Sequence, residues 1–412
     1  MIHPQHPQPS THWIGWQALQ RNAVAGIIAG CVTLPICIGV SMLSEFPVQA
    51  GLFSTLLACM IAFIVSFWRL GNQTGVPSIA VGLAPLLAMG VHQFGLHNMG
   101  FIVLMAGTWQ ALIWWRGWDA YVLKWMPAYL IEGLLVGLGL SLIQKFLPLM
   151  VATVPSSAEA TLASVPAWQM GVLSTVTLIL FLVLVQRYQK TSPAVPYAFV
   201  LFGGILLGGV LGLPKLHLEA GSLLPQWPLP HYDTWLQLLG MMALAILLGS
   251  INLLDQVMCH TAVVRMDAVA RPNNSSHSLI PVWLTSVLGS VAGGMPVLDV
   301  LGPTATNINA GASSKWALPF VALVMGVVLL NQSCLTLIPK YSLAVLMLFA
   351  GWKMLSGLFH IPALGAYPMA MAVLCTLSVW QMGLLEGLIL ALGVHYALQL
   401  GGHVWRKKVV VP

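Results

Sequence analysis

The chain has 412 residues, of which 58% are hydrophobic and 6% are charged, and its mean hydropathy is +0.88. Soluble globular domains of ordinary composition do not approach these values, which indicate an all-α polytopic membrane protein. The formal net charge of +6 comes from basic residues that stand singly between apolar spans. Nucleic-acid binding requires a clustered basic patch, so the composition excludes a nucleic-acid partner and predicts a lipid bilayer around most of the chain.

The first 20 residues have no apolar region typical of a cleavable signal, so 1–20 is predicted to be a cytoplasmic N-terminal tail. At about 20 apolar residues per crossing, the remainder contains fourteen segments. They lie near 22–43, 49–68, 77–92, 99–117, 126–147, 168–186, 196–212, 236–259, 278–293, 303–313, 317–337, 341–356, 367–382 and 384–400.

The third and tenth segments are too short to cross a bilayer, and each begins with proline and a hydroxyl residue. These starts, Pro77-Ser78 and Pro303-Thr304, are 226 residues apart. Proline is tolerated at the first helical position, where its missing N–H breaks no hydrogen bond. Paired interrupted helices in corresponding positions of two halves point to the binding site of a secondary transporter. We therefore predict that both segments are broken half-helices.

Seven segments in each half, with a broken helix third in each, predict 7+7 inverted repeats over 21–212 and 235–402. An extracytoplasmic loop at 213–234 connects them, and 403–412 forms a short basic cytoplasmic tail. With a cytoplasmic N-terminus, thirteen of the sixteen Lys and Arg residues fall inside and only Lys145, Lys215 and Lys340 fall outside. This distribution predicts a multi-pass protein of the inner (plasma) membrane with both termini cytoplasmic.

The two broken helices would present the unpaired N–H groups of their first turns and their positive dipole ends near the membrane midplane, where an anion fits. The alternative is that Pro77 and Pro303 only kink ordinary helices. The substrate-binding candidates are the hydroxyl residues and their neighbours at the two starts. They are Pro77, Ser78, Ile79, Leu301, Gly302, Pro303 and Thr304.

Ionisable residues inside spans are functional candidates because a buried charge is costly in a bilayer. In the eighth segment, the spacing of Asn252, Asp255 and Gln256 places them on one helical face. Asp255 is the candidate for H+ or Na+ coupling, and its alternative is a structural hydrogen-bond acceptor. Asn252 is a candidate for both anion and cation binding, and Gln256 for the anion. Asp299, just before the tenth segment, either caps the helix or helps to hold a cation.

No cofactor or metal is predicted. The six cysteines lack metal-ligand or disulfide spacing, and the chain contains no nucleophile elbow, P-loop or HExxH motif. An enzyme is therefore not expected.

Four stretches of the chain resemble conserved signatures of the sulfate permease (SulP) family, the bacterial relatives of the SLC26 anion transporters. The first is AGIIAGCVTLPICIGVSMLSEFPVQAGL, with Pro35, Pro47 and Gly51 in place. The second and third are GNQTGVPSIAVGLAPLLA and MPAYLIEGLLVGLGL. The fourth, GGMPVLDVLGPTATNINAGASS, is similar to the family pattern at Gly293, Gly294, Pro296, Thr304, Asn307, Ala310 and Gly311.

The resemblance implies fourteen transmembrane segments, a core domain that moves against a gate domain, a site between segments three and ten, and a homodimer. It also marks departures. The family usually carries a C-terminal STAS domain, whereas this chain stops short of one. Anion exchangers of the family often have arginine where Pro303 stands, and many members have an acid where Asn252 stands.

The sequence therefore predicts a secondary active transporter of a small inorganic anion, sulfate or bicarbonate-like, coupled to H+ or Na+ and working by alternating access. A nucleobase permease of the same architecture is an alternative, since such proteins use acids on the eighth and tenth helices. A non-transporting membrane sensor or scaffold is the alternative from another class.

Overall fold

The structure is a computed structural model. It describes residues 15–68, 73–118, 127–150, 167–188, 195–196, 199–211, 228–266, 274–331, 339–355, 365–382 and 384–408. These residues form fourteen α-helices and one pair of short strands. Each of the fourteen segments expected from hydrophobicity overlaps one α-helix.

The helices of the first half are α1 (Trp16–Leu43), α2 (Val48–Val65), α3 (Ala84–Phe94), α4 (Leu96–Arg116), α6 (Ala128–Phe146), α7 (Ala167–Tyr188) and α9 (Gly204–Leu211). Those of the second half are α10 (Trp235–Met266), α11 (Ser275–Gly289), α12 (Leu301–Asn309), α13 (Leu318–Leu330), α14 (Lys340–Leu355), α15 (Ala366–Met382) and α16 (Leu384–Lys408).

The helices at the two ends of the chain extend beyond their expected limits. α1 begins at Trp16, so the last residues of the expected tail 1–20 are already helical. α16 continues to Lys408, through most of the expected tail 403–412. Most of the expected connecting loop at 213–234 lies outside the described residues.

The segment that follows α2 is extended where a helix was expected. Strand β1 (Pro77–Ile79) pairs antiparallel with β2 (Val297–Asp299), and Pro77 is opposite Asp299. The expected helix start at Pro77 is therefore wrong: a 3-10 turn at Val81–Leu83 leads into α3, whose first turn contains Pro85. Proline is compatible with the first residue of a strand as well as with a first helical turn. The partner strand, more than 200 residues away, decides between the two.

The helix after β2 begins two residues before its expected start. α12 starts at Leu301, so Pro303 is its third residue. The missing N–H of a proline in the first turn costs no helical hydrogen bond. At eleven and nine residues, α3 and α12 are both too short to cross a bilayer.

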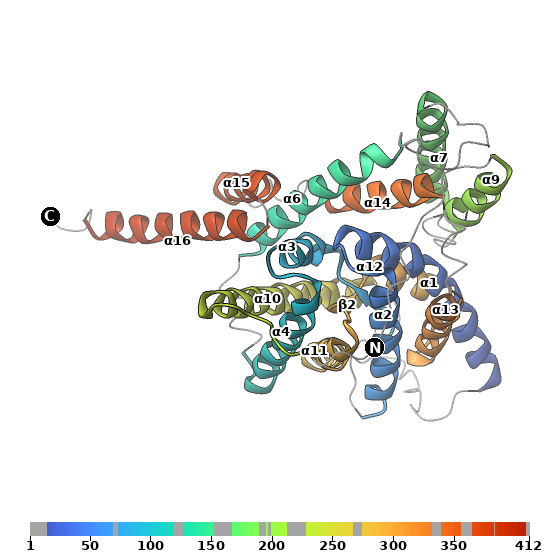
Figure 1. The fold of residues 1–412 in the computed structure, drawn as a ribbon, viewed down its shortest axis with the longest axis horizontal. Helices are drawn as coiled ribbons and strands as arrows, with labels where there is room; N and C mark the ends of the chain where they lie inside the picture. Colours follow the sequence, from blue (N-terminus) through green and yellow to red (C-terminus); the bar gives the residue numbers. More distant parts are fainter. Residues whose placement is uncertain are drawn as a thin grey trace, which may run out of the picture.

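The helices pack in two groups, each drawn from both halves of the chain (Figure 1). The strand-bearing group contains α1–α4, α10–α13 and both strands. The second helix group contains α6, α7, α9 and α14–α16. The groups meet where α1 contacts α14 and α3 contacts α16. At the first contact, Gly39 of α1 leaves room for the Met347 side chain, because a Cβ there would lie 2.3 Å from the Met347 sulfur.

Five helical stretches among the described residues are long and apolar enough to cross a membrane. They are Trp16–Leu43, Val48–Val65, Leu96–Arg116, Trp168–Tyr188 and Trp235–Val257. Several shorter apolar helices of 10–17 residues, among them Ala366–Met382, pack beside them. The chain is therefore a membrane-embedded, multi-pass helical protein.

Candidate functional site

The starts of α3 and α12 lie close together because each follows one strand of the same antiparallel pair. Because the strands are antiparallel, α12 follows the Asp299 end of the ribbon, and the 3-10 turn Val81–Leu83 leads to α3 from the Ile79 end. The free N–H groups and positive dipole ends of both helices are thus concentrated around β1 and β2. The sequence predicted two helix starts at Pro77 and Pro303, whereas here a strand precedes each helix.

The first turn of α12 has an open side. A Cβ built on Gly302 meets no described atom within 4 Å, and Leu301 is 40% exposed. Pro303, Thr304 and Ile79 are buried. Gly302 therefore leaves the backbone of this first turn accessible to a small anion.

Ser78 lies in β1 and is fully buried, not at a helix start. Its Oγ is 3.3 Å from the Cys37 Sγ of α1 and 3.2 Å from the Thr55 Oγ1 of α2. Cys37 and Thr55 are also in contact with each other, at 3.1 Å. The hydroxyl thus joins β1 to two neighbouring helices. Sequence reasoning missed Cys37 and Thr55, because their pairing with Ser78 depends on how three separate segments pack.

Thr304 connects α12 to the chain just before β1. Its Oγ1 accepts a hydrogen bond of 3.0 Å from the Val76 N–H, and the Val300 N–H donates to the Val76 carbonyl oxygen at 3.1 Å. One turn further along α12, Asn307 donates from Nδ2 to the Thr74 carbonyl oxygen at 3.0 Å. The segment leading into β1 is therefore held along one face of α12.

Asn252 and Gln256 of α10 contact β2. The Asn252 Nδ2 donates to the Val297 carbonyl oxygen at 3.1 Å. Gln256 Nε2 donates to Asp299 Oδ2 at 3.1 Å, and its Oε1 accepts from the Asp299 N–H at 2.7 Å. The structure thus brings together two of the three polar residues expected on this face and the β2 strand.

Asp255 lies on the same helix but has a different partner. It is half-buried, and its Oδ1 accepts a weak hydrogen bond of 3.7 Å from Cys259 Sγ, one turn further along. Asn252 Oδ1 is a buried acceptor for which the described residues supply no donor. A carboxylate and an amide oxygen are thus available within one turn of α10, and both are ligands that hard cations accept.

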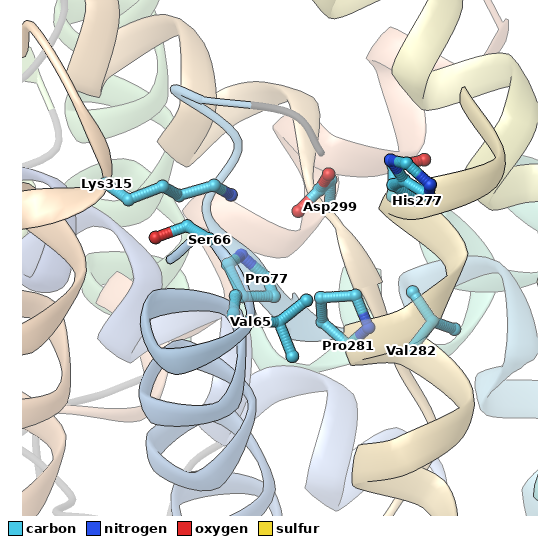
Figure 2. Close-up of a pocket in the computed structure, with 10 residues that line it drawn as sticks. Val65, Ser66, Pro77, His277, Pro281, Val282, Asp299 and Lys315 are labelled. Atoms are coloured by element: carbon cyan, nitrogen blue, oxygen red, sulfur yellow. The ribbon is translucent and has the colours of Figure 1, made fainter. Parts of the chain in front are cut away.

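A narrow pocket lies beside the strand pair, with room for about one water molecule at ≈ 10 Å³. In Figure 2, Lys315 extends into it from one side, and Asp299 and His277 lie on the other. The pocket is lined by Ala62, Val65, Ser66, Pro77, His277, Ser278, Pro281, Val282, Asp299 and Lys315. Asp299 is the last residue of β2, and Lys315 was missed as a site residue because a loop lysine is usually solvated.

Sequence comparisons find known relatives of this chain. The Sulfate permease family profile matches residues 19–374 of the chain. A Bacillus subtilis (strain 168) protein named "Putative sulfate transporter YvdB" is 23% identical over 358 residues, covering 82% of this chain and 65% of the relative. The Bos taurus "Sodium-independent sulfate anion transporter" is 22% identical over 441 residues, covering 91% of this chain and 69% of the relative. The chain thus spans about two thirds of the length of these relatives.

Solved structures show the same fold. The transmembrane domain of the cyanobacterial bicarbonate transporter BicA superposes with a TM-score of 0.71 at 20% identity, covering 91% of this chain and 98% of that domain. Murine Slc26a9, an anion transporter solved in the inward-facing state, superposes with a TM-score of 0.72 at 17% identity, covering 95% of this chain and 70% of that protein.

Proposed function

Because the chain belongs to the sulfate permease family, we propose that it is a secondary transporter of a small inorganic anion, sulfate or bicarbonate-like. The observation that supports this most directly is the convergence of two short helices, α3 and α12, on one antiparallel strand pair. Helix N-termini attract anions through their free N–H groups and dipoles without a formal positive charge.

The anion site in this proposal is formed by the N-terminal turns of α3 and α12 together with the strand pair. Gly302 opens the first turn of α12, and Thr304 fixes that turn against the segment before β1. The Ser78 hydroxyl holds β1 against α1 and α2 through its contacts with Cys37 and Thr55. Pro303 offers no charge at the position where related anion exchangers often have arginine, so backbone groups carry more of the recognition here.

Alternating access follows from movement of the strand-bearing group against the second helix group. In this proposal, the two groups act as the core and gate domains that the family resemblance implies. The strand-bearing group is tied together by hydrogen bonds between distant segments, such as Asn252 to Val297 and Asn307 to Thr74. Its contacts with the second group are fewer and lie mainly at α1–α14 and α3–α16. A rigid site can therefore move as a unit past a neighbouring helix bundle.

Asp255 is the proposed coupling residue, through either a proton or Na+. The Asn252 Oδ1 lies on the same face and is the proposed second oxygen ligand for a cation. The bovine relative is named a sodium-independent transporter, which makes a proton the first ion to test. We also propose that both termini are cytoplasmic, in the plasma membrane.

The test is uptake into proteoliposomes that contain the purified protein. Radiolabelled sulfate and bicarbonate are each supplied with and without inward H+ and Na+ gradients, and chloride and a dicarboxylate serve as competitors. The proposal expects saturable, gradient-dependent uptake of sulfate or bicarbonate. Protein that is folded and correctly inserted but moves none of these anions would overturn it and favour a sensor or scaffold.

A homodimer with one complete site per protomer is part of the same proposal. Helix association in lipid depends on close packing and a few polar contacts, so we expect a dimer that is weaker in detergent than in bilayers. Crosslinking in native membranes checks this expectation. Only monomer would reject the dimer, and inactive mixed dimers of wild-type and Asp255→Asn subunits would reject independent sites.

A further inference from the structure

Lys315 is a buried cation close to the strand pair. It begins the 3-10 turn Lys315–Ala317 that connects α12 to α13, and only 6% of its surface is exposed. The sequence predicts it to be one of thirteen basic residues in solvated cytoplasmic loops. Burying an ammonium group is strongly unfavourable unless an opposite charge and hydrogen bonds compensate it, so we looked for its partner among the nearby residues.

The contacts of Lys315 lead to the ends of both strands. Its Nζ donates to the Gly75 carbonyl oxygen at 3.5 Å, two residues before β1 begins. It also lines the narrow pocket together with Pro77 and Asp299, which are directly opposite each other in the strand register. In Figure 2, the Lys315 side chain extends across the pocket with its nitrogen end toward Asp299.

Asp299 is held from the other side by α10. It is 5% exposed, and Gln256 both donates to its carboxylate and accepts from its backbone N–H. Gln256 also donates to the Ser278 carbonyl oxygen of α11 at 3.4 Å. The carboxylate therefore has a fixed position, with one neutral amide donor from Gln256 and the Lys315 side chain across the shared pocket.

We propose that Lys315 and Asp299 form a buried charge pair that positions the two strand–helix units of the anion site. The pair joins the end of β2, the segment before β1 and the turn after α12, which are the three pieces of chain that set how the starts of α3 and α12 face each other. Lys315 is thus a positioning residue for an anion site in which Pro303 replaces the arginine of related exchangers. This inference rests on the proposed transport of an anion.

A charge pair makes a specific energetic prediction. Removing one member leaves an uncompensated buried charge, which is strongly destabilising, whereas removing both can be close to neutral. Two charges that interact across the pocket therefore give non-additive effects, and two unrelated residues give additive ones. Non-additivity separates the pair from two independent structural residues.

The experiment is a double-mutant cycle of Lys315→Met, Asp299→Asn and the combined variant. Lys315→Arg is the conservative variant, and Lys340→Met, in α14, is the matched control. Apparent KM and maximal rate of anion uptake are measured in proteoliposomes, and the unfolding temperature is measured in detergent. We expect each single change to raise KM about ten-fold, within the range of coupling energies between interacting residues. The combined variant should be no worse than the more damaged single variant, and Lys315→Arg and Lys340→Met should stay near wild type.

Five outcomes bear on the proposal. Single effects that multiply in the combined variant would overturn the pair, as would an unchanged KM in Lys315→Met. If a single variant does not fold, recovery of folded protein in the combined variant supports the pair, and failure to recover contradicts it. If the wild-type protein transports no anion, the proposed function fails, and the cycle of unfolding temperatures still decides whether the two charges are paired.

Discussion

The strand-bearing group and the second helix group are both helical and both buried in a membrane, but their interiors differ. Most buried polar side chains of the described residues lie in the strand-bearing group, including Thr55, Asn252, Gln256, Thr304 and Asn307. Their hydrogen bonds connect segments far apart in the sequence, such as Asn307 to Thr74 and Ser54 to the Met295 N–H. Such bonds specify one arrangement of the chain, because each buried group without its partner is costly.

The second helix group relies mainly on close backbone packing. A Cβ at Gly133 of α6 would lie 2.4 Å from the Ala372 carbonyl oxygen of α15, and one at Gly387 of α16 would lie 2.4 Å from the Val379 nitrogen. Small residues at helix contacts allow the backbones to approach, which is how helices associate in lipid. Polar contacts occur there too. Tyr129 and Tyr367 both contact His395 Nδ1, at 3.0 and 2.9 Å, and Thr376 Oγ1 donates to the Gly133 carbonyl oxygen at 2.9 Å. The strand-bearing group therefore holds most of the buried polar side chains of the described residues, whereas packing in the second group rests more on close helix approach.

The largest expected effect comes from disrupting the close packing of α6 against α15. Gly133→Leu places a side chain against the α15 backbone, which cannot move without displacing the helix, so we predict loss of folded protein. Leucine is a better helix former than glycine, so any loss comes from packing. Size-exclusion chromatography in detergent measures the folded fraction.

The matched control is Gly209→Leu in α9, where a Cβ meets no described atom within 4 Å. This variant should fold like wild type. Equal yields of the two variants would contradict the packing argument.

The next effect concerns the Asp255 carboxylate of the strand-bearing group. Asp255→Asn keeps the shape of the side chain but removes a carboxylate that can titrate or bind a cation. We expect gradient-driven uptake to be lost while anion-dependent protection against thermal unfolding is partly retained. Asp233→Asn, an exposed acid near the start of α10, is the control. Wild-type uptake by Asp255→Asn under every gradient would make Asp255 a structural residue. Asn252→Asp tests the opposite change on the same face.

A smaller effect is expected from the hydroxyls. Thr304→Ala leaves the buried Val76 N–H without its acceptor, and such a loss costs ~1–3 kcal/mol, so the apparent anion KM should rise by up to about a hundred-fold. Ser78→Ala should cost only ~0.5–1.5 kcal/mol of apparent anion affinity, because Cys37 and Thr55 can still contact each other. Thr304→Ser, which keeps the hydroxyl, should remain near wild type. Unchanged KM in both alanine variants would move the anion site elsewhere.

The smallest effect is expected at the surface end of the strand-bearing group. His92 Nε2 is 3.0 Å from Glu45 Oε1, and the two side chains are 70% and 38% exposed. Exposed pairs contribute ~0–1 kcal/mol and are weakened by salt. His92→Ala should therefore shift the unfolding temperature only slightly and leave anion uptake unchanged, as checked by a thermal melt at low and high ionic strength. A large loss of stability would show that the end of α3 depends on this pair.

The sequence by itself determined where the helices lie, because hydrophobicity along a membrane span is a local property. All fourteen expected segments overlap helices, and the spacing of Asn252 and Gln256 correctly placed both on the face that contacts the tenth-segment region. The two proline-containing segments also lie side by side, because β1 and β2 pair with each other. The helices and the face of the eighth segment depend on residues within one or two turns of each other, so a single stretch of sequence contains the information.

Only the tertiary structure decided whether each proline-containing segment begins as a strand or as a helix. Pro77 begins a strand because β2, distant in sequence, supplies its partner, while Pro85 takes the place in the first helical turn that was expected for Pro77. The Ser78 hydroxyl contacts Cys37 and Thr55 because three separate segments pack together there. Lys315, expected in a solvated loop, instead lines the same buried pocket as Asp299. Local sequence limits a residue to a few backbone conformations, and only its distant hydrogen-bond and charge partners select among them.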